Sequence, residues 1–351
     1  MTYTSSWRSP SNIALIKYWG KHGLQLPRNP SLSFTLSACH TNMTLVVDLS
    51  AGNPGIDILY DGQPKPSFEP KIKTFFSLLG DFFPWLNGSF VKIDSHNTFP
   101  HGAGIASSAS AMSAIALCLM DINDQINGHT TFPGEMWCKQ ASEIARIGSG
   151  SASRSVFPGA AIWGAADTID ESSDRHAIPW NEQLSQVYKD IQDTILIVSS
   201  SEKSVSSTAG HDLMKNHAYA NTRYEVARNN LSRLCEVMRH DEGLNTFINI
   251  VESEALQLHA LMMCGDSPFM LMESGTVSVI KEVWRFRKAT GIPVCFTLDA
   301  GPNVHLLYPS QYMSVVLAWI KNDLSPYCAN GQYILDQVGS GPQKIELYSG
   351  I

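Results

Sequence analysis

The stretch Phe99–Leu119, FPHGAGIASSASAMSAIALCL, decides how the first half of this chain folds. Its second part places Ala109, Met112, Ala116 and Leu119 three and four residues apart, which predicts a helix with one apolar face. Its first part holds glycine, alanine and serine where bulky residues would otherwise begin. Such a bare backbone predicts that another group comes close to the start of the helix.

The start of this helix has the chemistry of an anion site. The first N–H groups of a helix lack partners within it and carry a partial positive charge. Gly102 and Gly104 would let a phosphate approach, and Ser107 and Ser108 would add hydroxyl donors or a metal ligand. Serines also cap helices routinely, so a purely structural origin stays open. A dinucleotide fingerprint is rejected, because serine replaces its third glycine and the preceding strand ends too early.

The composition is that of a soluble globular protein. Of the 351 residues, 44% are hydrophobic and 16% are charged, and no apolar run approaches the roughly 20 residues that span a bilayer. A formal net charge of −7 argues against a nucleic-acid surface. The seven cysteines are scattered without zinc-type spacing, and the opening MTYTSSWRSP lacks a secretory signal. We therefore expect a cytoplasmic protein with free thiols that binds neither nucleic acid nor membrane.

Hydrophobic periodicity predicts an α+β architecture in two parts, since 351 residues exceed one ordinary core. The first part is expected to span 1–188 and the second 189–351. Helices are expected at residues 71–83, 135–146, 216–240, 245–263 and 276–288, besides the helix described above. Strands are expected at residues 41–49, 56–60, 89–95, 159–163, 193–200, 293–299 and 303–309.

Three further segments place polar residues among apolar neighbours. Lys17 lies between bulky residues in IALIKYWGK, with Lys21 four residues later; it either reaches solvent along its stem or is held for chemistry. Arg146 and Arg154 flank a glycine-serine turn, where Arg154 would clamp an anion or form an ordinary salt bridge. Asp299 follows an apolar strand and precedes Ala-Gly-Pro-Asn, which suits either a turn residue or a catalytic base.

Together these segments resemble the diphosphomevalonate decarboxylase family of the GHMP kinase superfamily. The resemblance rests on NIALIKYWGK, LPRNPSLS, GIASSASA, ARIGSGSASRS, SSTAGH, DAGPN and a terminal VGSGPQ, in that order. It implies a GHMP kinase fold with an N-terminal domain of ribosomal-protein-S5-like topology, a C-terminal α/β sandwich domain, and an active site in the cleft between them. By the same resemblance we expect a homodimer.

The resemblance also implies a reaction, in which ATP and Mg²⁺ are used to convert mevalonate 5-diphosphate to isopentenyl diphosphate, phosphate and CO2. Asp299 matches the aspartate that orients or deprotonates the tertiary hydroxyl, Lys17 the lysine beside the reacting centre, and Arg154 the arginine that grips the carboxylate. The sequence identifies no protein ligand for the metal. The predicted ATP loop comprises Gly102, Gly104, Ala106, Ser107, Ser108 and Ser110, and the predicted substrate contacts are Tyr18, Lys21, Ser153, Arg154 and Ser206.

The chain departs from the family pattern at several positions. His211 stands where methionine is usual, and FEPKIKTFF offers Lys71 and Lys73 where an arginine normally holds the distal phosphate. Mevalonate 5-phosphate, which needs one basic contact fewer, is therefore the alternative substrate. A kinase that does not decarboxylate and a non-catalytic nucleotide-binding scaffold are further alternatives, but both leave the joint presence of Arg154, Lys17 and Asp299 without a purpose.

Overall fold

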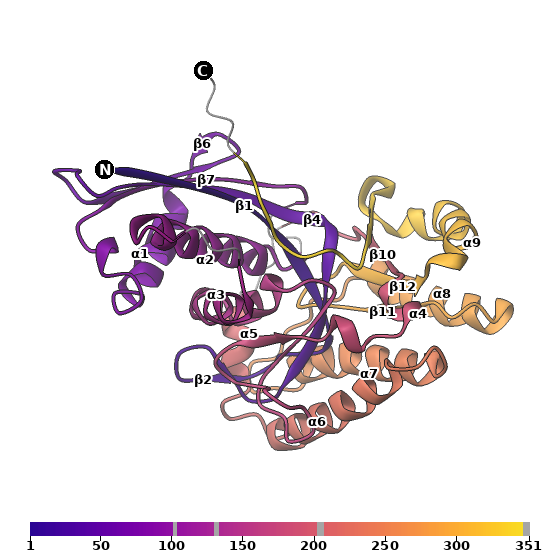
Figure 1. Ribbon diagram of the computed structural model, residues 1–351. Helices are drawn as coiled ribbons and strands as arrows, with labels where there is room; N and C mark the ends of the chain where they lie inside the picture. Colours follow the sequence, from indigo (N-terminus) through magenta and orange to yellow (C-terminus); the bar gives the residue numbers. More distant parts are fainter. Residues whose placement is uncertain (101–103, 130–132, 202–206, 347–351) are drawn as a thin grey trace.

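The computed structural model describes residues 1–100, 104–129, 133–201 and 207–346 of the chain. This part has an α+β architecture with two sheets, one in each half of the chain (Figure 1). The helices are α1 (Glu69–Ser77), α2 (Ser107–Ile126), α3 (Glu135–Gly148), α4 (Gln186–Lys189), α5 (Ser207–Leu213), α6 (Ala220–Val237), α7 (Leu244–Met263), α8 (Ser274–Thr290) and α9 (Met313–Trp319). No helix in these ranges is long and apolar enough to cross a bilayer.

The larger sheet belongs mainly to the first half of the chain. Its strands are β1 (Thr2–Ile16), β4 (Ser31–Asp48), β5 (Gly55–Tyr60), β6 (Gln63–Pro64), β7 (Phe90–Asn97), β8 (Ala160–Trp163), β9 (Ala177–Pro179) and β14 (Gln343–Lys344). The strands follow the order β14-β1-β4-β7-β5-β6, with β8 paired to β4 and β9 to β8. Only the pairing of β5 with β7 is parallel among these strands. A short ribbon of β2 (Lys21–His22) and β3 (Leu26–Pro27) follows β1.

The first strand was not predicted, because its side chains do not alternate between apolar and polar. Most of β1 from Ser5 onward is buried, and several of the buried side chains are serines. Helix α2 satisfies two of them: the Ser5 hydroxyl donates to Asp121 at 2.6 Å, and Ser9 donates to Ser113 at 2.7 Å. Buried polar groups that find such partners are tolerated in a core, although they hide the period of the strand.

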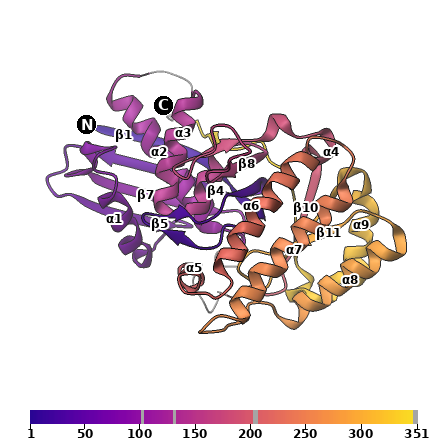
Figure 2. The same ribbon diagram turned by 90° about the horizontal axis from the view of Figure 1, so that it is seen from below.

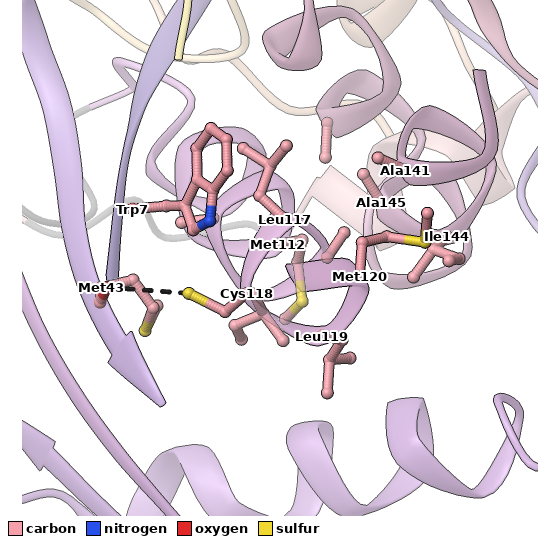
Figure 3. Close-up of a cluster of buried hydrophobic side chains, with 14 of the residues drawn as sticks. Trp7, Met43, Met112, Leu117, Cys118, Leu119, Met120, Ala141, Ile144 and Ala145 are labelled. Carbon is pink, nitrogen blue, oxygen red and sulfur yellow. Dashed lines mark hydrogen bonds between the residues drawn. The ribbon is translucent and has the colours of Figure 1, made fainter. Parts of the chain in front are cut away.

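The core of the first half lies between this sheet and helices α2 and α3. Figure 3 shows side chains from β1, β4, α2 and α3 packed together, with the Cys118 thiol 3.8 Å from the Met43 carbonyl oxygen. A glycine at the end of α3 lets the two helices approach closely. A Cβ on Gly148 would lie 2.7 Å from the sulfur of Met112 in α2. The packing of α3 on α2 therefore depends on the missing side chain of Gly148.

The smaller sheet contains β10 (Ile191–Leu196), β11 (Cys295–Thr297), β12 (Val304–Pro309) and β13 (Tyr333–Gln337), in the antiparallel order β11-β12-β10-β13. Side chains of α6 and α7 pack on one face of it, and those of α8 and α9 pack on the other. Seen from below, α6 and α7 run side by side across the junction of the two halves (Figure 2). The chain then returns to the first half, where β14 pairs with β1 (Figure 1).

The two sheets are connected at a bulge in β4, where its register with β1 is interrupted. Opposite Pro10 lies His40, but opposite Asn12 lies Thr35, so residues 36–39 bulge out of the ladder. The backbone N–H groups of Ser37, Ala38 and Cys39 donate to the carboxylate of Asp336 in β13, with N···O distances of 2.7–2.8 Å. The division into 1–188 and 189–351 stays a prediction.

Candidate active site

A cavity of about 500 Å³ lies where the two halves meet. Its wall is built from the end of β1, the residues before and at the start of α2, the segment after α3, α5, α7 and the turn that follows β11. Nine of the predicted site residues line it, and they come from four separate stretches of the chain. These are Lys17, Tyr18, Lys21, Gly104, Ala106, Ser107, Ser108, Arg154 and Asp299.

The start of α2 has an unusual backbone. The N-cap residue is Ala106, which adopts a left-handed conformation (φ 47°, ψ 40°) and makes no side-chain capping bond. Gly104 also has positive φ, and a Cβ there would lie 3.5 Å from the Cα of Gly301, beside Asp299 in sequence. The serines therefore do not cap this helix. Ser107 and Ser108 line the cavity, where the free N–H groups of the first turn are available to an anion.

Two of the predicted contact residues, Ser110 and Ser153, do not line the cavity. Ser110 is fully buried one turn deeper, with its hydroxyl 2.7 Å from that of Thr41 and donating to the carbonyl of Ser107. Ser153 is also fully buried and donates to the Gly150 carbonyl at 2.8 Å, because residues Gly150–Val156 form a 3₁₀ helix and not the expected turn. Both hydroxyls support the backbone of the site. The predicted Gly102 and Ser206 lie outside the described residues.

Lys17 and Asp299 form an ion pair across the junction of the two halves. The Lys17 Nζ donates to Asp299 Oδ1 at 3.1 Å and to the Ala14 carbonyl at 2.5 Å. Lys17 is 2% exposed and Asp299 is 23% exposed, so the carboxylate faces the cavity and the ammonium lies behind it. Burial lowers the pKa of Lys17, against the opposing effect of Asp299. Lys17 does not reach solvent along its stem.

Arg154 is a buried cation without a carboxylate within salt-bridge distance in the described structure. It is 2% exposed, and its guanidinium donates to Ser33 at 2.9 Å, Ser31 at 2.7 Å and Asn12 at 3.3 Å. Burial lowers its pKa to about 10, which still leaves it charged at neutral pH. A charge held only by neutral acceptors at a cavity wall attracts an anionic ligand. The ordinary salt bridge considered above is therefore excluded for the described residues.

The backbone of Lys17 is fixed by a fully buried carboxylate. Glu254 of α7 accepts the Lys17 N–H at 2.9 Å, the Asn230 amide at 2.8 Å, and both Nη groups of Arg223 at 2.8 and 2.5 Å. The Lys17 carbonyl in turn accepts Asn29 Nδ2 at 3.0 Å. Helices α6 and α7 thus hold the backbone of Lys17 in place.

The turn that carries Asp299 is held by α7 as well. His259 Nε2 donates to the Asp299 backbone carbonyl at 3.1 Å. Burial lowers the pKa of His259 to about 4, so the ring is neutral at physiological pH and Nε2 carries its proton. One helix therefore positions both members of the Lys17–Asp299 pair.

Aromatic rings wall the cavity near Lys21. His211 lies between the rings of Tyr18 and Trp19, at centroid distances of 4.3 and 4.9 Å. Gly150 allows the close approach of Tyr18, since a Cβ there would lie 2.9 Å from the Tyr18 hydroxyl. That hydroxyl is buried and has no hydrogen-bond partner in the described structure. It is a donor available to a ligand.

At its other end the cavity is largely apolar. It continues between α1, β5, β7 and α2, a shape and chemistry suited to a planar ring with polar edges. The wall there includes Met43, Ile58, Tyr60, Phe68, Ile93, Asn97, Met112 and Ile115. The cavity thus has an apolar end, a middle formed by the first turn of α2, and a charged end at Lys17, Arg154 and Asp299.

Sequence reasoning missed the supporting residues. Glu254, Arg223 and His259 sit within amphipathic helices, where charged residues at such positions are usually solvated. Asn12 was also missed, although it lines the cavity and donates to Ser151 and Ser155 while accepting from Arg154. The sequence feature that could have identified these residues is a charged or amide side chain within an otherwise apolar segment. Only the structure, which shows its burial, distinguishes such a side chain from one on the surface.

The two sheets, the junction cavity and the helix start define a protein with the GHMP kinase type of fold. The chain belongs to the diphosphomevalonate decarboxylase family. Residues 9–175 match the diphosphomevalonate decarboxylase-like N-terminal domain, and residues 194–345 match the mevalonate 5-diphosphate decarboxylase C-terminal domain.

Named relatives extend over nearly the whole chain. Diphosphomevalonate decarboxylase mvd1 of Aspergillus fumigatus is 29% identical over 92% of this chain and 81% of its own length. The rat diphosphomevalonate decarboxylase is 27% identical over 95% of this chain and 83% of its own. The solved mevalonate diphosphate decarboxylase of Staphylococcus aureus is 27% identical, with a TM-score of 0.84 and 99% of each chain covered. MDDEF in complex with MVAPP, AMPPCP and magnesium is 28% identical, with a TM-score of 0.82 over 99% of this chain and 100% of that one.

Proposed function

We propose that this protein catalyses the ATP-dependent decarboxylation of mevalonate 5-diphosphate to isopentenyl diphosphate, a step of the mevalonate pathway of isoprenoid biosynthesis. ADP, phosphate and CO2 are the other products. The observation that carries the proposal is the charged end of the cavity. There a buried ammonium, a buried guanidinium and a carboxylate facing the cavity lie together beside the start of α2.

The three charged groups have separate tasks. Asp299 accepts the hydrogen bond of the tertiary 3-hydroxyl and orients its oxygen for phosphoryl transfer. Lys17, fixed behind it, offsets negative charge that develops on the transferred group. Arg154 holds the substrate carboxylate in a planar grip. The 3-phosphate leaves with the electron pair of its C–O bond. At the same time the C–C bond to the carboxylate breaks, CO2 departs, and the electron pair of that C–C bond forms the new double bond.

The residues present fit a nucleotide with its metal. Gly104, Ala106, Ser107 and Ser108 would hold the phosphates, and the apolar end of the cavity would hold the base. The unpartnered Tyr18 hydroxyl supports an anionic ligand nearby. Magnesium would neutralise phosphate charge, as it does when it is bound by substrate phosphates and few protein oxygens. The described residues contain no cluster of three or more His, Cys, Asp or Glu side chains that would hold a metal alone.

Lys71 supports a diphosphate over a monophosphate. Its side chain lines the cavity, whereas Lys73 is paired with Glu69 at 2.6 Å on the outer side of α1. Burial lowers the pKa of Lys71, and the nearby charge of Lys21 lowers it further. Two cations that repel each other at one end of a cavity suit a doubly charged ligand. Lys71 is our candidate for the basic contact that replaces the family's arginine.

The test is to measure CO2 release and ADP formation with Mg-ATP and either mevalonate 5-diphosphate or mevalonate 5-phosphate. Coupled release with the diphosphate supports the proposal, and the Lys71→Gln variant should then raise KM for it more than Lys73→Gln. Turnover with the monophosphate alone would contradict the substrate. ADP without CO2 would contradict decarboxylation.

We also propose a cytoplasmic location, because all seven cysteines are free. The homodimer stays a prediction that rests on the family resemblance.

A further inference from the structure

A second hollow, of about 210 Å³, opens beside the catalytic cavity. Lys21 and His211 line both hollows and form the wall between them. The remaining wall residues that matter here are Arg28, Lys215 and Tyr224, which do not line the catalytic cavity. The volume is several times the roughly 30 Å³ share of one water molecule, so a hydrated polyatomic ion fits. We call this hollow the side pocket.

The side pocket is cationic. Lys21, Arg28 and Lys215 line it, and no carboxylate does so among the described residues. Lys215 pairs with Asp212 at 2.8 Å, and both side chains are largely exposed. Burial lowers the pKa of Lys21, and Lys215 lowers it further against the effect of Asp212. Cations that repel one another are stabilised by an anion bound between them.

His211 adds a neutral donor to the shared wall. Its Nδ1 accepts the Gly20 backbone N–H at 3.0 Å. Burial lowers its pKa to about 3, so the ring is neutral and the proton resides on Nε2. Methionine, the usual residue of the family at this position, would offer no such donor.

The geometry of the pocket is set by a close contact. Gly20 has a φ of +94°, and a Cβ at this position would overlap the Tyr224 hydroxyl. The Tyr224 ring from α6 therefore seats directly on the backbone beside Lys21. This contact fixes the side pocket relative to the catalytic cavity, so the two hollows share Lys21 in one arrangement.

We propose that the side pocket is a phosphate-binding site with Arg28 and Lys215 as ligand residues that Lys21 connects to the catalytic cavity. The ligand is inorganic phosphate, and its source in the reaction rests on the proposed function. The positive charge, the room for an oxyanion and the continuity through Lys21 do not depend on it.

The experiment compares Arg28→Gln and Lys215→Gln with Lys73→Gln, which removes an exposed positive charge outside the side pocket. Binding of inorganic phosphate is measured by isothermal titration calorimetry at low ionic strength, with no ATP present. KM is measured for mevalonate 5-diphosphate and for the monophosphate. Each pocket variant should raise the Kd for phosphate by about three- to tenfold, the range expected for the loss of one partly exposed charged contact.

The outcomes decide between inorganic phosphate and the substrate as the ligand. Weaker binding of inorganic phosphate with unchanged KM values supports the proposal. A raised KM for the diphosphate with unchanged binding of inorganic phosphate would overturn it, because the pocket would then hold the distal phosphate of the substrate. If both pocket variants match Lys73→Gln in every measurement, the side pocket is not a phosphate site. Calorimetry decides this even if the wild type releases no CO2, which would contradict the proposed function separately.

Discussion

Replacing Glu254 by glutamine should destabilise the protein and slow its turnover together. The carboxylate is fully buried and accepts both Nη groups of Arg223, which is 2% exposed. A neutral amide leaves this guanidinium buried without its counter-ion, which costs about 3–5 kcal/mol in comparable buried pairs. The same change replaces the charged acceptor of the Lys17 N–H. Native proteins are stable by only about 5–15 kcal/mol, so this loss is a large part of the total and should be easily measured.

The assay is urea unfolding at neutral pH together with kcat for CO2 release. Glu252→Gln is the matched control, because Glu252 pairs with Arg287 at 2.7 Å but Arg287 is 23% exposed and lies away from Lys17. We expect the control to lose about 1 kcal/mol and to keep its kcat. The reasoning is refuted if Glu254→Gln loses no more stability than the control. If Glu254→Gln loses the expected stability but keeps its kcat, only the claim that Glu254 positions Lys17 is refuted.

Four further predictions concern the charged groups of the site. Asp299→Asn should lower kcat by about 10²–10⁴-fold with ATP binding retained in a fluorescence titration, and near-normal turnover would contradict the role of Asp299. Arg154→Lys should lower kcat/KM by about 100-fold, since a point charge cannot reproduce a planar grip; an unaffected value would put the carboxylate elsewhere. Burial lowers the pKa of Lys17, so kcat should fall on the alkaline side before the ordinary lysine value of 10.5, and a profile flat to that pH would be inconsistent with this. His211 and His259 have folded pKa values of about 3 and 4, below the ordinary 6.5, so the unfolded chain binds more protons under mild acid. Stability should therefore fall by about 1 kcal/mol per histidine between pH 7.5 and 5.5, and His211→Met should remove its share in urea unfolding; an unaltered pH dependence would count against the buried neutral ring.

The elements that the sequence predicts best are those with one buried face. Helices α2, α3, α7 and α8 have apolar residues at helical spacing, and the structure confirms each of them with bounds shifted by a few residues. Strand β1 was not predicted because serines that hydrogen-bond to α2 lie buried among its apolar residues and hide the alternation of the strand. The bulge of residues 36–39 was not predicted either, because its hydrogen-bond partner Asp336 lies about 300 residues away in sequence.

The charged site residues were predictable because their types are rare in apolar surroundings. Lys17, Arg154 and Asp299 follow this rule, and the structure brings them to one cavity. Ser110 and Ser153 do not line the cavity, because both hydroxyls are fully buried and bonded to Thr41, Ser107 and Gly150, which a motif does not reveal. Glu254 was missed because a glutamate within a helix is usually solvated, and only tertiary packing buries it.

The contact between Gly104 and Gly301 suggests a route to inhibitor design. It joins the backbone before α2 to the turn after Asp299, so the groups expected to hold nucleotide phosphates and the carboxylate expected to meet the hydroxyl come from different halves of the chain. A compound that binds between Gly104 and Gly301 would leave both halves folded and yet keep the start of α2 and Asp299 from lying side by side. Such a compound would not need to imitate ATP, and selectivity would come from the residues around two glycines instead of from the nucleotide pocket.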